Sequence, residues 1–169
     1  MSRPTSLGIS FVVVLYNQRA SVRDLYVRIA LACSVRNVNF EIIYVDRGSN
    51  DGSWEEIAQL SLSDSRIHAT RKRLSSSDAD ALAAAFRVST GDLVLTLTPG
   101  CNEAAIVNGF MDTLDRRGDI LSRFDNEPSA NVYRRMKSSE SRAQEPLSCI
   151  SGNFYKTPGS PTQSDALWT

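Results

Sequence analysis

Residues 40–54 read FEIIYVDRGSNDGSW, and this stretch decides the fold. The run from Phe40 to Val45 is apolar apart from one glutamate, which predicts a buried strand. A loop with two glycines follows it. The run Ser53-Trp54-Glu55-Glu56 then has the form of a capping box, in which a serine and an acid three residues later satisfy the first N–H groups of a helix. Strand, loop and helix start in succession are typical of a βαβ unit.

The same alternation extends to both sides of this stretch. Ile9 to Tyr16 predicts an earlier buried strand, and Ser21 to Asp24 predicts a capping box at the start of the helix that follows. Arg66 to Thr70 and Leu93 to Leu97 predict two later strands. Apolar residues at helical spacing predict four helices, with inner faces of Val22, Leu25, Ile29 and Cys33; of Trp54, Ile57 and Leu60; of Leu82, Ala83 and Phe86; and of Ile106, Val107, Phe110, Met111 and Leu114.

The third of these helices has a capping box of its own at Ser77 to Asp80, and Ile120 and Leu121 are expected to begin a fifth strand. Four alternations of strand and helix favour the α/β class, with a mostly parallel sheet and helices on both faces. We therefore expect residues 1–125 to form one domain of this class. Residues 126–169 are rich in serine and proline, and we expect an irregular or disordered tail there.

Charge and composition exclude several classes of protein. The 19 basic and 19 acidic side chains cancel, so no long-range field would gather nucleic acid. No apolar stretch approaches the ~20 residues of a membrane span, and we expect no secretory signal. Three cysteines far apart and one histidine favour neither a disulfide framework nor a zinc site. We expect a cytoplasmic protein.

Ligands of an open parallel sheet bind outside the carboxyl ends of its strands, which selects four loops. Asp46 ends a buried strand, and two interpretations of it stay open: it binds a nucleobase or ribose, or it bonds to its own loop in an Asx-turn. The run Arg71-Lys72-Arg73 is either a phosphate site or a solvated surface. The other two loops are Tyr16-Asn17-Gln18 and Thr98-Pro99-Gly100-Cys101-Asn102.

Several of these blocks together carry a family resemblance: VVVLYNQ at residues 12–18, EIIYVDRGSNDGSW at 41–54, ALAAAFR at 81–87 and TGDLVLTL at 90–97. In this order and spacing, residues 8–121 resemble family 2 of the inverting glycosyltransferases, which have the GT-A fold. The chain is most similar to the polyprenyl-phosphate sugar transferases, such as dolichyl-phosphate mannose synthase. The resemblance implies a nucleotide diphosphate sugar as donor, Mg²⁺ or Mn²⁺ as cofactor, and a location that is peripheral at the membrane.

The resemblance also implies a set of site residues. Those for the nucleotide are Tyr16, Asn17, Gln18, Asp46, Gly48 and Ser49, and those that remain candidates for phosphate are Arg47, Arg71, Lys72 and Arg73. No catalytic residue is assigned.

The chain departs from the family where the donor chemistry would occur. Arg47 replaces the second acid of Asp-Asp-Gly-Ser, and Asp78 replaces a lysine before the third helix. The Asp-x-Asp motif after the fourth strand aligns with Thr98-Pro99-Gly100. Both carboxylates of the metal motif are therefore missing, and the one nearby acid, Glu103, is a poor site for a cation that needs several oxygen ligands. We expect no metal site.

Three hypotheses remain. The first is a degenerate glycosyltransferase-like domain that binds a nucleotide weakly or partners an active glycosyltransferase. The second is an active, metal-independent transferase that acts on a polyprenyl-phosphate or glycan acceptor and in which arginines supply the positive charge. The third is a non-enzymatic interaction module. Sugar, base and acceptor cannot be inferred from the residues.

Overall fold

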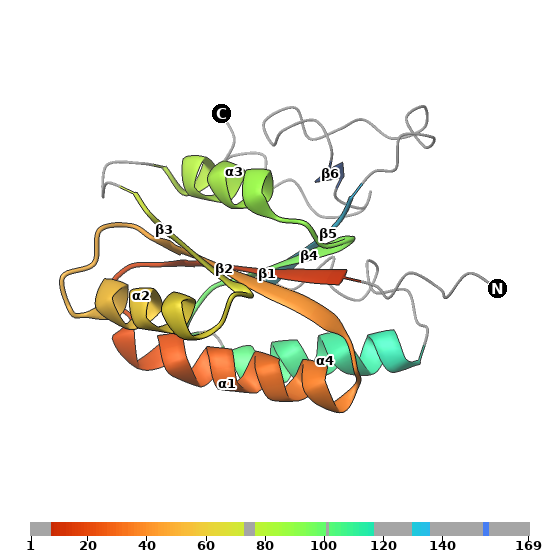
Figure 1. The fold of residues 1–169 in the computed structure, drawn as a ribbon. Helices are drawn as coiled ribbons and strands as arrows, with labels where there is room; N and C mark the ends of the chain where they lie inside the picture. Colours follow the sequence, from red (N-terminus) through yellow and green to blue (C-terminus); the bar gives the residue numbers. More distant parts are fainter. Residues whose placement is uncertain (1–7, 73–76, 101, 117–129, 136–153, 156–169) are drawn as a thin grey trace.

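The computed structural model describes residues 8–72, 77–100, 102–116, 130–135 and 154–155 (Figure 1). Six strands form one sheet in the order β3-β2-β1-β4-β5-β6. Strands β3, β2, β1 and β4 pair in parallel, and β5 pairs antiparallel with both β4 and β6. The strands are β1 (Gly8–Leu15), β2 (Asn39–Asp46), β3 (Ile67–Arg71), β4 (Leu93–Leu97), β5 (Ala130–Arg135) and β6 (Phe154–Tyr155).

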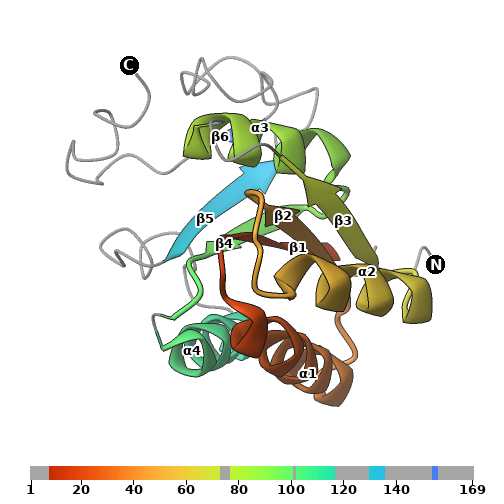
Figure 2. The ribbon, with the colours of Figure 1, turned by 90° about the vertical axis from the view of Figure 1, so that its left-hand side faces the viewer.

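The helices cover the two faces of the sheet unequally. Helices α1 (Arg19–Val35), α2 (Ser53–Ser63) and α4 (Glu103–Asp115) lie on one face, and α3 (Asp78–Val88) lies on the other (Figures 1 and 2). The α/β class and the helices on both faces are thus confirmed. Among the described residues, α3 is the one helix on its side of the sheet. On that side, Val14 of β1 is only half-buried.

The central strands are apolar on both sides because both sides are buried. Phe11 and Val13 belong to the core cluster with α1, α2 and α4, whereas Val12 belongs to the cluster with α3. Phe11 meets Phe110 of α4 edge to face, with ring centroids 6.2 Å apart. The buried hydroxyl of Tyr44 donates to the carbonyl of Val22 at 2.8 Å, which satisfies its one polar group.

Two of the three predicted capping boxes are wrong. Helix α1 begins at Arg19, two residues before Ser21, and α2 begins at Ser53 itself after Gly52. Asp51 serves both starts instead: one carboxylate oxygen accepts from the backbone N–H of Arg19 at 3.0 Å and the other from that of Ser53 at 3.0 Å. The third box is confirmed, since Ser77 caps α3 and Asp80 accepts from the backbone N–H of Ser77 at 3.2 Å.

The expectation of an irregular chain after residue 125 is wrong for residues 130–135. This segment is strand β5, which pairs antiparallel with β4 so that Val132 lies opposite Leu95. Its side chains alternate, with Ala130 and Val132 in one core cluster and Tyr133 in the other. The apolar residues look isolated in the sequence because the strand is short and buried on both faces. The strand expected at Ile120 and Leu121 falls outside the described residues.

Candidate functional site

The loops that follow β1, β2 and β4 are joined to one another at the carboxyl edge of the sheet. The backbone N–H of Asn17 donates to Ser49 Oγ at 2.9 Å, and Asn17 Oδ1 accepts from the backbone N–H of Asn50 at 2.9 Å. Asn17 has a φ of 51°, a left-handed conformation that asparagine tolerates better than most residues. Gln18 Nε2 donates to the carbonyl of Pro99 at 3.1 Å. Asn17 and Gln18 therefore brace the loops to one another.

Asp46 shows the loop-bonded arrangement, one of the two alternatives that its position allowed. Its side chain is fully buried, and its oxygens accept from the backbone N–H groups of Gly48 at 3.3 Å and Ser49 at 3.2 Å. The hydroxyl of Ser49 also donates to it. Gly48 has a φ of 86°, which allows the chain to turn back on the carboxylate. The turn fixes the shape of the loop from within.

Arg71 is the ionic partner of this buried carboxylate. Its Nε lies 3.2 Å from Asp46 Oδ2, and its Nη2 donates to the carbonyl of Ser49 at 2.8 Å. The guanidinium also lies 5.5 Å from the centre of the Trp54 ring. The backbone N–H of Lys72 donates to the carbonyl of Asp46 at 2.7 Å. Arg71 thus holds the β2 loop, while Arg73 lies outside the described residues.

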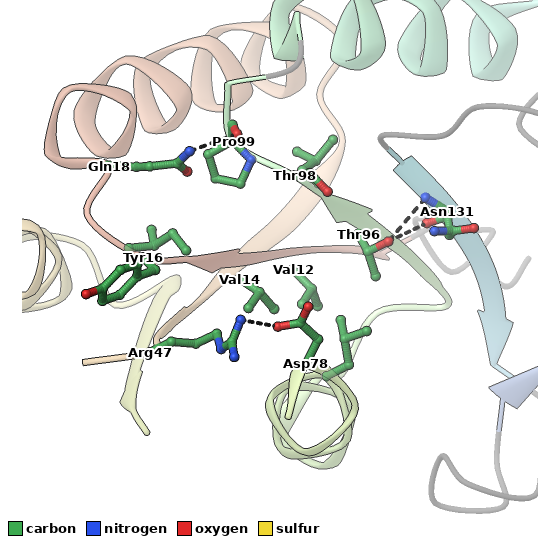
Figure 3. A pocket seen from close by; sticks show the side chains of 13 residues that line it. Val12, Val14, Tyr16, Gln18, Arg47, Asp78, Thr96, Thr98, Pro99 and Asn131 are labelled. Atoms are coloured by element: carbon green, nitrogen blue, oxygen red, sulfur yellow. Dashed lines mark hydrogen bonds and ion pairs between the residues drawn. The ribbon is translucent and has the colours of Figure 1, made fainter. Parts of the chain in front are cut away.

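A pocket of about 400 Å³ opens on the α3 face of the sheet beside these loops (Figure 3). Its base is formed by residues of β1 and β4, among which Val14 is half-buried, and Tyr16, which is 41% exposed, stands at its rim. Strand β5 contributes Asn131, whose backbone N–H donates to Thr96 Oγ1 at 3.1 Å. The lining residues are Val12, Val14, Leu15, Tyr16, Gln18, Arg47, Asp78, Leu82, Thr96, Leu97, Thr98, Pro99 and Asn131.

Two of the departures from the resembled family contact each other in this pocket. Arg47 of the β2 loop forms an ion pair with Asp78 at the start of α3 (Figure 3). The residues are 31 positions apart in the sequence, and nothing in the local pattern predicts that they meet. They carry charges opposite to those that the family has at the matching positions. The pair keeps a charged link between the β2 loop and α3.

The residues at this edge do not fit a divalent cation. Thr98, Pro99 and Gly100 follow β4, and the carboxylate of Glu103 accepts from the backbone N–H of Gly100. Asp78, the one carboxylate among the described residues that line the pocket, is paired with Arg47. In the described parts of the chain, no three His, Cys, Asp or Glu side chains gather as a metal-binding group. A hard cation needs several oxygen ligands at once.

Comparison with known proteins identifies the family. The profile of Glycosyl transferase family 2 matches residues 10–99, which span β1 to β4 and the loops at their carboxyl ends. The chain belongs to glycosyl transferase family 2. Of the residues that the sequence predicts to bind the nucleotide or its phosphates, Tyr16, Gln18 and Arg47 line the pocket, whereas Asp46, Gly48 and Ser49 lie in the adjoining loop.

Curated relatives of this family 2 domain are undecaprenyl-phosphate 4-deoxy-4-formamido-L-arabinose transferases. The one from Aeromonas hydrophila subsp. hydrophila is 34% identical over 90 residues, which are 53% of this chain and 28% of the relative. The one from Edwardsiella ictaluri is 27% identical over 132 residues, which are 77% of this chain and 41% of the relative. The similarity supports the polyprenyl-phosphate branch of the family. The chain spans less than half the length of these relatives.

The fold of the family 2 domain is also that of a solved glycosyltransferase. A mannosyltransferase from Pyrobaculum calidifontis, solved with GDP-Man and Mn²⁺, superposes with a TM-score of 0.50 at 18% identity. The match covers 64% of this chain and 32% of that one. The fold is GT-A. No helix within the described ranges combines the length and apolar content that a membrane span requires.

Proposed function

We propose that this domain binds a nucleoside diphosphate, or its sugar conjugate, in the pocket of the α3 face without a divalent cation, and that it does not transfer the sugar by itself. The observation that carries the proposal is the lining of the pocket: Tyr16 and Arg47 can contact a nucleotide. Thr98, which also lines the pocket, and Gly100 after it stand where the resembled family has its two metal-binding carboxylates. Substrates of parallel α/β sheets bind at this edge.

The proposed roles follow from exposure and charge. Tyr16 presents an exposed ring on which a nucleobase can stack. Arg47 offers a guanidinium whose planar fork matches phosphate oxygens. Asp46 acts indirectly, because its carboxylate is buried and holds the loop that carries Arg47. In this proposal Arg47 binds the phosphates but does not by itself balance the charge of a departing diphosphate, which is the role of a Lewis acid.

A thermal-shift titration tests the proposal. UDP, GDP and their sugar conjugates are added to the chain with Mn²⁺ or with EDTA. A ligand at a hundredfold excess over its Kd stabilises the native state by about 2.7 kcal/mol, which raises the Tm of a domain of this size by several degrees. We expect a shift that EDTA does not abolish. A shift that requires Mn²⁺ contradicts the metal-free site, and no shift with any nucleotide contradicts nucleotide binding.

One observation favours a second candidate, an active metal-independent transferase with a polyprenyl phosphate as acceptor. Arg47 lines the pocket, and a fixed cation aimed at a developing charge contributes to catalysis. This candidate requires sugar transfer to undecaprenyl phosphate in EDTA, with a loss of at least about tenfold in Arg47→Ala. The absence of transfer favours the first proposal. A protein partner such as an active glycosyltransferase, and a peripheral place at the membrane, remain proposals of the same kind.

A further inference from the structure

Arg47 and Asp78 face each other on one wall of the pocket (Figure 3). We propose that this ion pair is an exchangeable latch: Arg47 binds the diphosphate of the ligand, and Asp78 is the internal carboxylate that the diphosphate displaces. The inference rests on the proposed function, since it concerns the ligand of the same pocket. It assigns Asp78 as the residue that sets the affinity of the pocket for phosphate charge.

The exposure of the two side chains makes the exchange feasible. Arg47 is 26% exposed and Asp78 is 60% exposed, so water already screens their attraction. An ion pair with one partner this exposed costs less to separate than a fully buried pair. A diphosphate carries more charge than one carboxylate and can accept two parallel N–H bonds from the guanidinium. It therefore competes favourably for Arg47.

The backbone around each partner has an anchor that does not involve the ion pair. The backbone N–H of Arg47 donates to the carbonyl of Leu15 at 3.0 Å, which fixes the root of its side chain on the sheet. The start of α3 is held by the capping box between Ser77 and Asp80, without the side chain of Asp78. The latch can thus open by rotation of side chains alone.

The second ion pair at this edge is not exchangeable in the same way. Asp46 is fully buried, and it accepts from Gly48 and Ser49 as well as pairing with Arg71. A phosphate that displaced it would leave a buried carboxylate without its ionic partner, which is costly. Arg47, rather than Arg71, is therefore the residue that a diphosphate recruits.

The test is a double-mutant cycle measured by calorimetry in EDTA. The ligands are whichever of UDP and GDP binds more tightly, with its monophosphate and its nucleoside. We expect Asp78→Asn to tighten diphosphate binding about fivefold, to tighten monophosphate binding less, and to leave nucleoside binding unchanged. Arg47→Gln should weaken diphosphate binding, and in the double variant the gain from Asp78→Asn should vanish. A merely structural pair would not respond to the number of phosphates.

Asp24→Asn is the matched control. Asp24 is 61% exposed and pairs with Arg28 on α1, so the variant makes the same change of charge at the same exposure away from the pocket. It should bind the diphosphate as the unmodified chain does. A diphosphate that binds equally to the unmodified chain and to Asp78→Asn overturns the latch and leaves the proposed function standing. No binding by the unmodified chain or any variant overturns both.

Discussion

Asp46 carries a buried carboxylate that stabilises the loop after β2. Its carboxylate accepts from the N–H groups of Gly48 and Ser49 and pairs with Arg71. In Asp46→Asn the charge that balances Arg71 is lost, and the amide NH₂ faces N–H donors instead of accepting from them. We expect a loss of about 2–3 kcal/mol in the free energy of unfolding, measured by urea denaturation.

The control for this prediction is Asp24→Asn, which removes an exposed carboxylate from α1. Its ion pair with Arg28 is the i,i+4 type, for which we expect a change of about 0.5 kcal/mol or less. Equal effects of the two variants would mean that the turn around Asp46 does not support the fold.

At the scale of single residues, the sequence predicted which loops meet at the carboxyl edge of the sheet but not the partners of their side chains. Nucleotide binding by Asn17 and Gln18 stays a prediction, and the structure shows that both residues bond to the neighbouring loops. The pairing of Arg47 with Asp78 was not foreseen, because it depends on where α3 begins relative to the β2 loop. The order of the strands places loops side by side that are distant in the sequence. A local sequence pattern does not predict which side chains of these loops then contact each other.

At the scale of elements, the segment just before β4 approaches β1 too closely to admit a side chain at Gly91. A Cβ atom there would lie 2.7 Å from both the backbone nitrogen and the hydroxyl of Ser10, and 2.9 Å from the carbonyl of Gly8. Backbone atoms cannot move aside without disturbing the pairing of the strands. We expect Gly91→Ala to cost about 2–4 kcal/mol of stability by urea denaturation.

Gly8 is the matched control for this close approach. Its added Cβ would meet its nearest neighbours at 3.5 Å and beyond, an ordinary contact distance. Gly8→Ala should change the unfolding free energy by less than about 1 kcal/mol. If Gly91→Ala were as mild, the approach of the two strands would be looser than the structure shows.

The junction between α1, α2 and β3 depends on Asp64, and the dependence is testable by pH. The carboxylate accepts from Arg66 just before β3 and from the hydroxyl of Tyr26 on α1 at 3.1 Å. These bonds, with that from Arg66 the strongest, lower the pKa of Asp64 from 3.8 to about 2. A lowered pKa means that the stabilisation is present above the unfolded-state pKa and is lost as the pH falls through that of the folded state.

We therefore expect Asp64→Asn to be less stable than the unmodified chain by about 1–2 kcal/mol at pH 7. The difference should shrink as the pH falls from about 4 to about 2, because the carboxylate of the unmodified chain becomes protonated there. Urea denaturation at several pH values measures it. A difference that persisted at pH 2 would show that the charge of Asp64 is not what joins these elements.

The first N–H groups of a helix are satisfied either by residues next to the helix in the sequence or by a residue of a distant loop, and this protein shows both cases. Ser77 and Asp80 cap α3 as the sequence predicts, because both lie at the start of that helix, three residues apart. Helices α1 and α2 begin beside each other and share Asp51 of the β2 loop. A residue that serves two helices from a third segment leaves no signal in the spacing of either helix.

At the scale of the whole molecule, the parallel half of the sheet was predictable because its strands are buried on both faces. Runs such as ISFVVVL and FEIIYV admit few other structures, and the alternation with helices then sets the fold class. Strand β5 escaped prediction because its six residues carry only three buried apolar side chains. Its position in the sheet follows from its pairing with the edge of β4 that β1 does not occupy.

Tyr133 of β5 tests whether the folded unit extends beyond residue 125. Its ring is buried and meets Phe86 of α3 edge to face, with centroids 5.0 Å apart, and burial raises its pKa to about 12. Removal of the ring would open a cavity between the sheet and α3. We expect Tyr133→Ala to cost about 3–4 kcal/mol in the free energy of unfolding by urea denaturation.

The matched control is Tyr16→Ala, which removes the same ring from the exposed rim of the pocket and should change stability by less than about 1 kcal/mol. If the two variants were equally stable, β5 would be an accessory strand and the core would end before it. If Tyr133→Ala alone is destabilised, β5 completes the face on which the pocket lies. Asn131, the neighbour of Tyr133 on this strand, would then line the pocket as part of the same cooperative unit as β1 and β4.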